Sequence, residues 1–254
     1  MRYHGRVLES FLQGAVALLT EVSGTEPAPG AFDPWIELAA LAGPVPRRGP
    51  LSHDILLARR GTKSFGLNVF AHDPGLPFAR VAHSWARDFL GASPDPVLDV
   101  PGVRVHGGVA VRASELVLKL YATDGLPELA GRLGVELADA VAIGVDVTRR
   151  GLERARTYHP APPGALPASG SHRLVTLLRG TGAKRTDNVI FRPEAPVADL
   201  LALGDPAVDV ELVAALTDLA RGHGLSLRAV AHETDHFDDG RVETDALVAA
   251  GAPG

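Results

Sequence analysis

The sequence predicts an α+β fold: a ten-stranded antiparallel β-barrel made of repeated α-β-β-α units, with the helices outside. Pairs of short strand-like segments recur along the chain, and helix-like segments separate them. The strand segments alternate apolar and polar side chains, so each offers one face to a core and one polar face. Closure of such a sheet removes its exposed edges. We therefore expect one domain over 1–254, with a helical part at 1–50 and hairpin repeats at 51–250.

The composition limits the function. The 254 residues are 46% hydrophobic and 22% charged, which are ordinary globular values. The net charge of -5 argues against a general nucleic-acid binder, and the lack of cysteine excludes disulfides, thiolate metal sites and cysteine nucleophiles. We find no signal-peptide pattern and no apolar run that would span a membrane. We expect a cytoplasmic monomer that binds neither nucleic acid nor membrane.

The helices are predicted from apolar residues at helical spacing. In 6–22 these residues are Val7, Phe11, Ala15, Leu18 and Val22. The same reasoning gives helical segments at 35–41, 77–90, 126–137, 197–203 and 208–222. The connection 160–171 holds four prolines, so we expect no regular helix there.

The strands are expected to pair as five hairpins: 52–59 with 64–72, 102–111 with 115–122, 140–148 with 152–159, 172–179 with 187–193, and 225–234 with 241–248. In the third hairpin, β-branched residues share one face and Asp146 lies on the other. In the fifth, Arg228 and His232 lie opposite a leucine and alanine face. We expect the apolar faces to meet the helices and the polar faces to line the interior. The alternative is an open two-layer sheet with a solvated outer face.

Two strands place cations and a tyrosine on one face. They are Lys119-Leu120-Tyr121 and Arg154-Ala155-Arg156-Thr157-Tyr158. The chain has only three lysines and three tyrosines, and these strands hold one of the lysines and two of the tyrosines. Such a surface suits an anion with several oxygens, because arginine donates several directed hydrogen bonds.

These two motifs resemble those of the ABBA-type aromatic prenyltransferases, whose fold is the PT barrel, and in particular its indole- and peptide-prenylating branch. There, Lys-x-Tyr and Arg-x-Lys-x-Tyr bind an allylic diphosphate and cover its carbocation. The resemblance implies that Lys119, Arg154 and Arg156 bind the diphosphate and that Tyr121 and Tyr158 act as catalytic residues beside the allyl group. This sequence differs from the family pattern at Ser64, where the family often has a basic residue.

Further site residues follow from strand parity and from the resemblance. Strand parity places Asn188, Arg192 and Arg228 on polar strand faces. We expect these side chains to donate further hydrogen bonds to the diphosphate. The family often has an acid on its first strand that orients the acceptor; Asp54 is the only acid there, and we count it as catalytic. The acceptor or general-base candidates besides Asp54 are Asp146, His232 and Glu243. Asp146 alternatively pairs with Arg154 or Arg156 across its own hairpin.

No metal site is expected. His232 and His236 lie four apart on an expected strand, which separates them by about 13 Å. The sequence requires no cofactor; use of Mg²⁺ stays open, because no Asp-rich motif is present.

The main hypothesis is therefore an enzyme, a prenyltransferase of secondary metabolism. It would move a dimethylallyl or geranyl group from its diphosphate to an aromatic small molecule or a peptide side chain. One alternative is a non-catalytic or differently catalytic barrel that binds an anionic small molecule. Another is an open-sheet scaffold, in which the cations form surface ion pairs.

Overall fold

The computed structural model describes residues 2–46, 51–58, 63–70, 76–160, 172–179, 184–191, 195–237 and 239–252. Its helices are α1 (Arg2–Ser23), α2 (Asp33–Ala42), α3 (Phe78–Trp85), η1 (Ala86–Leu90), α4 (Asp95–Leu98), α5 (Leu126–Leu133), α6 (Val197–Leu201) and α7 (Val210–Gly222). Its strands are β1 (His53–Leu56), β2 (Ser64–Val69), β3 (Val105–Arg112), β4 (Glu115–Ala122), β5 (Ala142–Thr148), β6 (Gly151–Pro160), β7 (His172–Arg179), β8 (Lys184–Ile190), β9 (Ser226–Phe237) and β10 (Val242–Gly251).

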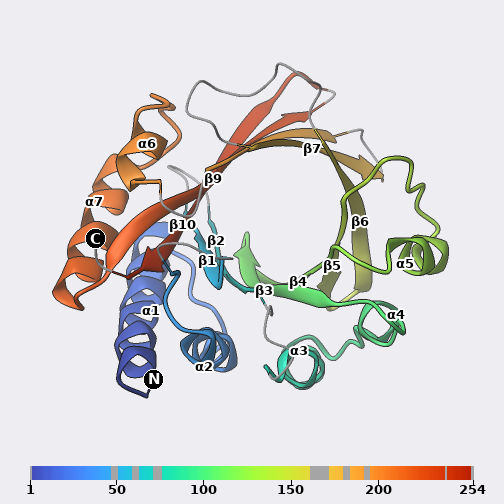
Figure 1. The fold of residues 1–254 in the computed structure, drawn as a ribbon, viewed down its shortest axis with the longest axis horizontal. Coiled ribbons are helices and arrows are strands. Elements are labelled where there is room, and N and C mark those ends of the chain that lie inside the picture. Colours follow the sequence, from blue (N-terminus) through green and yellow to red (C-terminus); the bar gives the residue numbers. More distant parts are fainter. Residues whose placement is uncertain are drawn as a thin grey trace.

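The strands form one antiparallel ladder that follows chain order (Figure 1). The ladder returns on itself, because β1 pairs with β10 through Ile55 and Val248 as well as with β2. The predicted α+β class with sequential hairpins is thus confirmed. The closed order of strands does not fit the open-sheet alternative.

The helices lie outside the sheet, and the main core lies between the two layers (Figure 1). This position of the core follows from the alternation of side chains along the strands. In β4, Leu118 and Leu120 are fully buried against the outer layer, while Lys119 and Tyr121 face inward. β5 repeats the pattern with three buried β-branched residues on its outer face. These face assignments agree with the sequence prediction.

The segment before β1 packs against one end of the barrel. Val45 bridges to Gly251, and its amide donates to the carbonyl of Ala250 at 2.9 Å. Its side chain is buried in a small interior cluster with Leu56 and Leu247. This end is therefore packed with apolar side chains.

Two helical segments differ from the prediction. The helix expected over 77–90 changes at residue 86 from the α-helical α3 to the π-helical η1, and it ends at Gly91 with a φ of 64°. The short α4 was not predicted, because four residues are too few for a helical apolar period to be recognised.

A β-bulge between β9 and β10 changes which residues face inward. Ala231 pairs with Leu247, but the next pair is Ala229 with Val248, so Val230 is inserted. Because one extra residue reverses the alternation, His232 lies on the outer face rather than in the interior. There its Nε2 lies 3.0 Å from Asp205 Oδ2. The expected interior position of His232 was therefore wrong.

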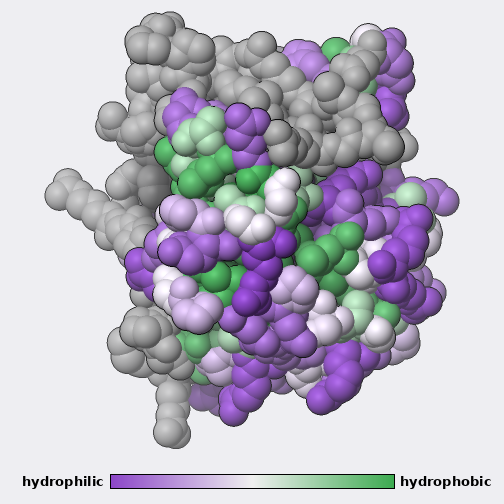
Figure 2. Space-filling view, turned by 90° about the vertical axis from the view of Figure 1, so that its right-hand side faces the viewer, coloured by the Kyte–Doolittle hydropathy of each residue, from purple (hydrophilic) through white to green (hydrophobic). Residues whose placement is uncertain are grey.

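The surface seen in Figure 2 is mixed. Hydrophobic residues form small separate groups between hydrophilic ones on this face. None of the helices in the described ranges combines the length and the hydrophobicity that a membrane span needs.

Candidate active site

Four rings line one wall of the barrel interior. Phe70 and His106 have centroids 4.8 Å apart, His106 stacks on Tyr121 at 5.6 Å, and Tyr121 lies 6.1 Å from Tyr158. Alternate positions on β3, β4 and β6 deliver the last three rings to the same face, and Phe70 follows β2. The expected convergence of Tyr121 and Tyr158 is therefore present in the structure.

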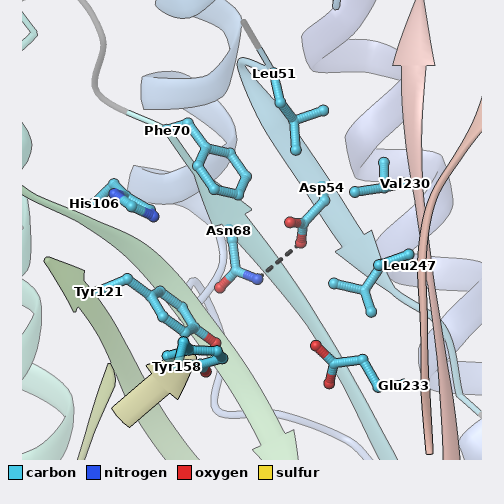
Figure 3. Close-up of a pocket in the computed structure, with 11 residues that line it drawn as sticks. Leu51, Asp54, Asn68, Phe70, His106, Tyr121, Tyr158, Val230, Glu233 and Leu247 are labelled. Atoms are coloured by element: carbon cyan, nitrogen blue, oxygen red, sulfur yellow. Dashed lines mark hydrogen bonds between the residues drawn. The ribbon is translucent and has the colours of Figure 1, made fainter. Parts of the chain in front are cut away.

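The wall borders a cavity of about 300 Å³ (Figure 3). Its other sides come from β1, β2, β9, β10 and residue 51. The lining residues, called the pocket below, are Leu51, Asp54, Asn68, Phe70, His106, Tyr121, Tyr158, Val230, Ala231, Glu233 and Leu247.

Asp54 and Asn68 face each other across β1 and β2 and form the polar floor of the pocket. Asn68 Nδ2 donates to Asp54 Oδ1 at 2.8 Å, and both side chains are buried. Burial raises the pKa of Asp54 to about 7; the hydrogen bond from Asn68 opposes this, and the charge of Glu233 adds to it. A carboxyl group with a pKa near neutrality can exchange a proton at physiological pH.

Glu233 is a second pocket carboxylate, which the sequence analysis did not single out. It faces inward from β9, and Figure 3 shows its carboxylate directed into the pocket. Burial raises its pKa, while the charge of Lys119 opposes the shift. The inserted Val230 places Glu233 inside, whereas strict alternation from Arg228 puts residue 233 on the outer face.

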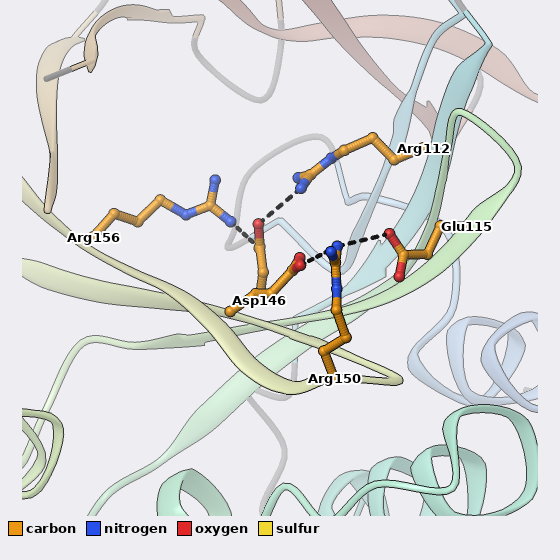
Figure 4. Close-up of polar contacts among 6 residues, drawn as sticks. Arg112, Glu115, Asp146, Arg150 and Arg156 are labelled. Carbon is orange, nitrogen blue, oxygen red and sulfur yellow. Dashed lines mark hydrogen bonds and ion pairs between the residues drawn. The ribbon is translucent and has the colours of Figure 1, made fainter. Parts of the chain in front are cut away.

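Two arginines, Arg112 and Arg156, lie around the carboxylate of Asp146 (Figure 4). Asp146 accepts from Arg112 Nη1 at 3.0 Å and from Arg156 Nη2. Although burial by itself raises the pKa of Asp146, the charges of Arg156 and Arg112 lower it to about 2. Asp146 therefore stays ionised and is poorly suited to act as a base. We call Arg112, Lys119, Asp146 and Arg156 the charged cluster.

Lys119 belongs to this cluster by register, since it pairs with Asp146 across β4 and β5. Burial lowers its pKa, and Arg112 and Arg156 lower it further. Arg156 links the cluster to the wall, with its Cζ 5.9 Å from the centroid of the Tyr121 ring. Its buried Nε has no hydrogen-bond partner in the described part of the chain.

Arg112 was missed by the sequence analysis. The strand pattern predicts a turn at this residue, after 102–111, whereas Arg112 is the last residue of β3 and shares the inward face with His106. It pairs directly with Ser64 of β2. A cation therefore lies directly beside Ser64, on the neighbouring strand.

Three other expected site residues lie away from the pocket. Arg154 faces the cluster by its pairing with Asp146, but its side chain is exposed. Arg228 is buried at the end closed by Val45, where it donates to the carbonyls of Pro46 and Ala252 at 3.3 and 3.0 Å. Glu243 is partly exposed, and Arg241 Nη1 donates to it at 2.9 Å.

Two expectations fall outside the described structure. Arg192 is not among the described residues, and for Asn188 only the backbone position in β8 is described. By its pairing with Glu233, that backbone position faces the interior.

A possible metal-ligand group lies elsewhere, on the surface. Ligand atoms of His83, Asp95 and Asp99 lie within 4.8 Å of one another, and both aspartates are exposed. Each imidazole nitrogen of His83 already faces a different carboxylate, at 3.2 and 3.5 Å. These contacts lie on the surface, outside the barrel.

Comparison with known proteins gives one informative likeness. No protein-family model matches the chain, and a search of curated proteins finds no match. The structure is similar to the crystal structure of 5-dimethylallyltryptophan synthase from Streptomyces coelicolor, an ABBA prenyltransferase. The TM-score is 0.63 and the identity 14%, over 95% of this chain and 97% of that chain. The likeness confirms the fold that the two sequence motifs indicated.

Proposed function

We propose that this chain is a prenyltransferase that moves the prenyl group of an allylic diphosphate to an electron-rich aromatic acceptor. The observation that carries the proposal is the position of the tyrosine pair. Tyr121 and Tyr158 line the pocket, while Tyr121 also contacts the guanidinium of Arg156 in the charged cluster. Cations for a leaving diphosphate and rings for a carbocation are thus adjacent.

The first step is cleavage of the allylic C–O bond. Both bonding electrons leave with the diphosphate oxygen, and the prenyl group becomes a carbocation. Arg112, Lys119 and Arg156 would stabilise the developing negative charge, and the unpartnered Nε of Arg156 is one available donor. Arg154 supplies a further cation on the same strand face.

The second step is bond formation to the acceptor. A ring carbon of the acceptor attacks the carbocation, which Tyr121 and Tyr158 shield from water. After the new C–C bond forms, the attacked ring carbon still carries its hydrogen, which must leave as a proton. Asp54 would accept that proton and restore aromaticity, because its pKa of about 7 leaves a useful fraction ionised at neutral pH.

Binding and turnover with dimethylallyl and geranyl diphosphate test the proposal, with tryptophan and simple phenols as acceptors and with and without Mg²⁺. Lys119→Ala and Arg156→Ala should each weaken diphosphate binding at least about tenfold, because each removes a charge-assisted contact. Arg104→Ala is the matched control, since Arg104 is exposed and pairs with Asp124 outside the barrel. Absence of diphosphate binding, or equal affinity in all variants, contradicts the proposal.

A non-catalytic anion-binding barrel is the second candidate. The inward-facing cations Arg112, Lys119 and Arg156 support it, because they can bind an anion whether or not a reaction follows. In that case the protein binds inorganic pyrophosphate as tightly as the allylic diphosphates, and no acceptor is prenylated. Formation of any prenylated product excludes it.

A further inference from the structure

Three side chains of the candidate site meet above one residue of β5. Gly144 pairs with Tyr121 of β4 on one side and with Arg156 of β6 on the other. Strands two apart in a sheet lie roughly 9–10 Å from each other, so side chains of β4 and β6 meet only above the β5 residue between them. Here they do meet: the Tyr121 centroid lies 5.9 Å from Cζ of Arg156 and 6.1 Å from the centroid of Tyr158 (Figure 3).

The space above Gly144 is already filled by these neighbours. A Cβ atom at this position would lie 3.0 Å from Cε2 of Tyr158 and 3.1 Å from Nε of Arg156. The third nearest atom, at 3.2 Å, is Cγ of Arg156. Contacts this short force the neighbours to move, because carbon atoms pack at about 3.5–4.0 Å. A side chain at 144 would therefore press on Arg156 and Tyr158 rather than on the backbone.

A glycine of the neighbouring wall has a different reason for being there. At Gly108 of β3 a Cβ would lie 1.8 Å from the backbone oxygen of Leu67, so this glycine allows β2 and β3 to approach each other. The backbone of Gly144 makes no such demand, and its φ lies outside the positive region that favours glycine. Glycine also weakens a strand, since it has no side chain to pack. The two side chains that lie over Gly144 explain its presence.

We propose that Gly144 is a positioning residue of the site: its missing side chain lets Arg156 and Tyr158 lie together against β5. It thereby fixes the distance between a cation for the leaving diphosphate and a ring that shields the carbocation. Tyr158 borders the cavity, so its ring has room to move when a methyl group is added at 144. The pair is then displaced while the fold is kept. The inference rests on the proposed function, and specifically on anion binding at Arg156.

The variant Gly144→Ala tests the inference by adding one methyl group. Isothermal titration calorimetry with inorganic pyrophosphate should show binding weakened about tenfold, because a charge-assisted hydrogen bond of Arg156 is misplaced. The kcat for prenyl transfer should fall about 10–100-fold, because the reacting groups lose their alignment. The Tm should stay within about 4 °C of the wild type, since the ring moves into the cavity.

Gly131→Ala is the matched control. Gly131 is exposed on α5, and a Cβ added there has no atom within 4 Å. This variant makes the same chemical change outside the barrel, so it should alter neither pyrophosphate binding nor kcat.

A double-mutant cycle shows whether Gly144 acts through the ring. In a Tyr158→Ala background, Arg156 can move into the space of the lost ring, so adding Gly144→Ala should weaken pyrophosphate binding less than about threefold. Equal losses in both backgrounds overturn the inference. So does unchanged pyrophosphate binding in Gly144→Ala, and so does loss of the native fold in that variant, since the glycine would then serve the fold.

The two proposals can fail separately. A chain in which Gly144→Ala weakens pyrophosphate binding, but which transfers no prenyl group, keeps this inference and loses the prenyltransferase function. A chain that transfers prenyl groups equally well with glycine or alanine at 144 keeps the function and loses this inference. A wild type that binds no pyrophosphate loses both.

Discussion

Asp54 shows how one side chain acquires a chemical property from its position. A surface aspartate is fully ionised at neutral pH, but here burial stabilises the protonated form and the pKa rises to about 7. Asn68 orients the carboxyl group from the paired position on β2. The result is a fixed group able to take up a proton inside a closed sheet.

Asp54→Asn should lower the rate of prenyl transfer by at least about 100-fold, because a general base typically contributes that much. In the wild type the rate should rise as the pH passes through about 7, since only ionised Asp54 accepts the proton. The pH profile of kcat, measured by product formation, shows whether this rise is lost in Asp54→Asn. A rise that persists in the variant would assign the base to another group.

The same pKa predicts an effect on stability. Because the folded pKa of Asp54 lies above its unfolded value of 3.8, its contribution is complete below that value and is lost as the pH rises through about 7. Urea unfolding at pH 5 and pH 8 should show a smaller loss of stability in Asp54→Asn than in the wild type. An equal loss in both proteins contradicts the raised pKa.

Asp146 has the opposite role, that of a built-in counter-ion. Asp146→Asn should destabilise the protein, by up to about 3–5 kcal/mol, because it leaves the mostly buried guanidinium of Arg156 and the partly exposed one of Arg112 without their anion. Inorganic pyrophosphate should raise the Tm of this variant more than that of the wild type, as measured by thermal unfolding. The control is Asp139→Asn, an exposed aspartate outside the cluster. Equal pyrophosphate shifts in variant and wild type contradict this role.

At the scale of elements, the seam between β1 and β10 is the shortest part of the ladder. β1 has four residues, and two register pairs join it to β10. A side chain adds to this seam: the amide of Ala250 donates to His53 Nε2 at 3.2 Å, and Ser52 Oγ lies 3.1 Å from His53 Nδ1. Burial lowers the pKa of His53 to about 4, so the ring is neutral and can accept.

Acid should therefore weaken the seam. His53 has a folded pKa below its unfolded value of 6.5, so its contribution is complete above that value and is lost as the pH falls through about 4. The difference in unfolding free energy between wild type and His53→Ala should be smaller at pH 4 than at pH 7. A difference that is constant or larger in acid would show that His53 is not bound as a neutral ring.

Strand alternation predicted most of the elements, and the exceptions have local causes. Ile143 and Val145 alternate with Gly144 and Asp146, which determines the two faces of β5 from sequence alone. The bulge at Val230 could not be predicted from alternation, because the residues around it are small and apolar and fit either face of the sheet. His232 was therefore assigned to the wrong face, and Glu233, the second pocket carboxylate, was missed.

The charged cluster was only half predictable for a similar reason. The two tyrosine motifs identified Lys119 and Arg156 from residues close in sequence. The pairing of Asp146 with Arg156 was one of the two predicted roles of Asp146, and the structure confirms it. Arg112 and Asp146 meet through three strands, and the pairing of Ser64 with Arg112 becomes visible only in the register of β2 and β3. Sequence spacing does not encode such contacts across strands.

Across the described residues, one core joins the helical layer to seven of the strands. Phe11 of α1, both tryptophans and outer-face residues of β1–β5, β9 and β10 belong to the same buried cluster. The single domain over 1–254 stays a prediction. It implies that damage in the helical part should reduce the stability of the sheet.

Phe11→Ala should cost about 3–5 kcal/mol and unfold the chain in one step. Tryptophan fluorescence reports Trp35 and Trp85, both fully buried, while far-UV circular dichroism reports the sheet and helices together. The two signals should give the same urea midpoint. Val22→Ala, at an exposed position of the same helix, should leave that midpoint nearly unchanged. Separate midpoints would mean that the helical part and the sheet unfold independently.

The position of the seam has a consequence for how the protein is made. The floor of the pocket combines Asp54 from β1 with Glu233 from β9 and Leu247 from β10. On the ribosome, β1 emerges early and must wait with an unpaired edge until the last strand is synthesised. Ligand binding is therefore a property of the finished chain alone, and a chaperone that covers the edge of β1 should raise the yield of folded protein.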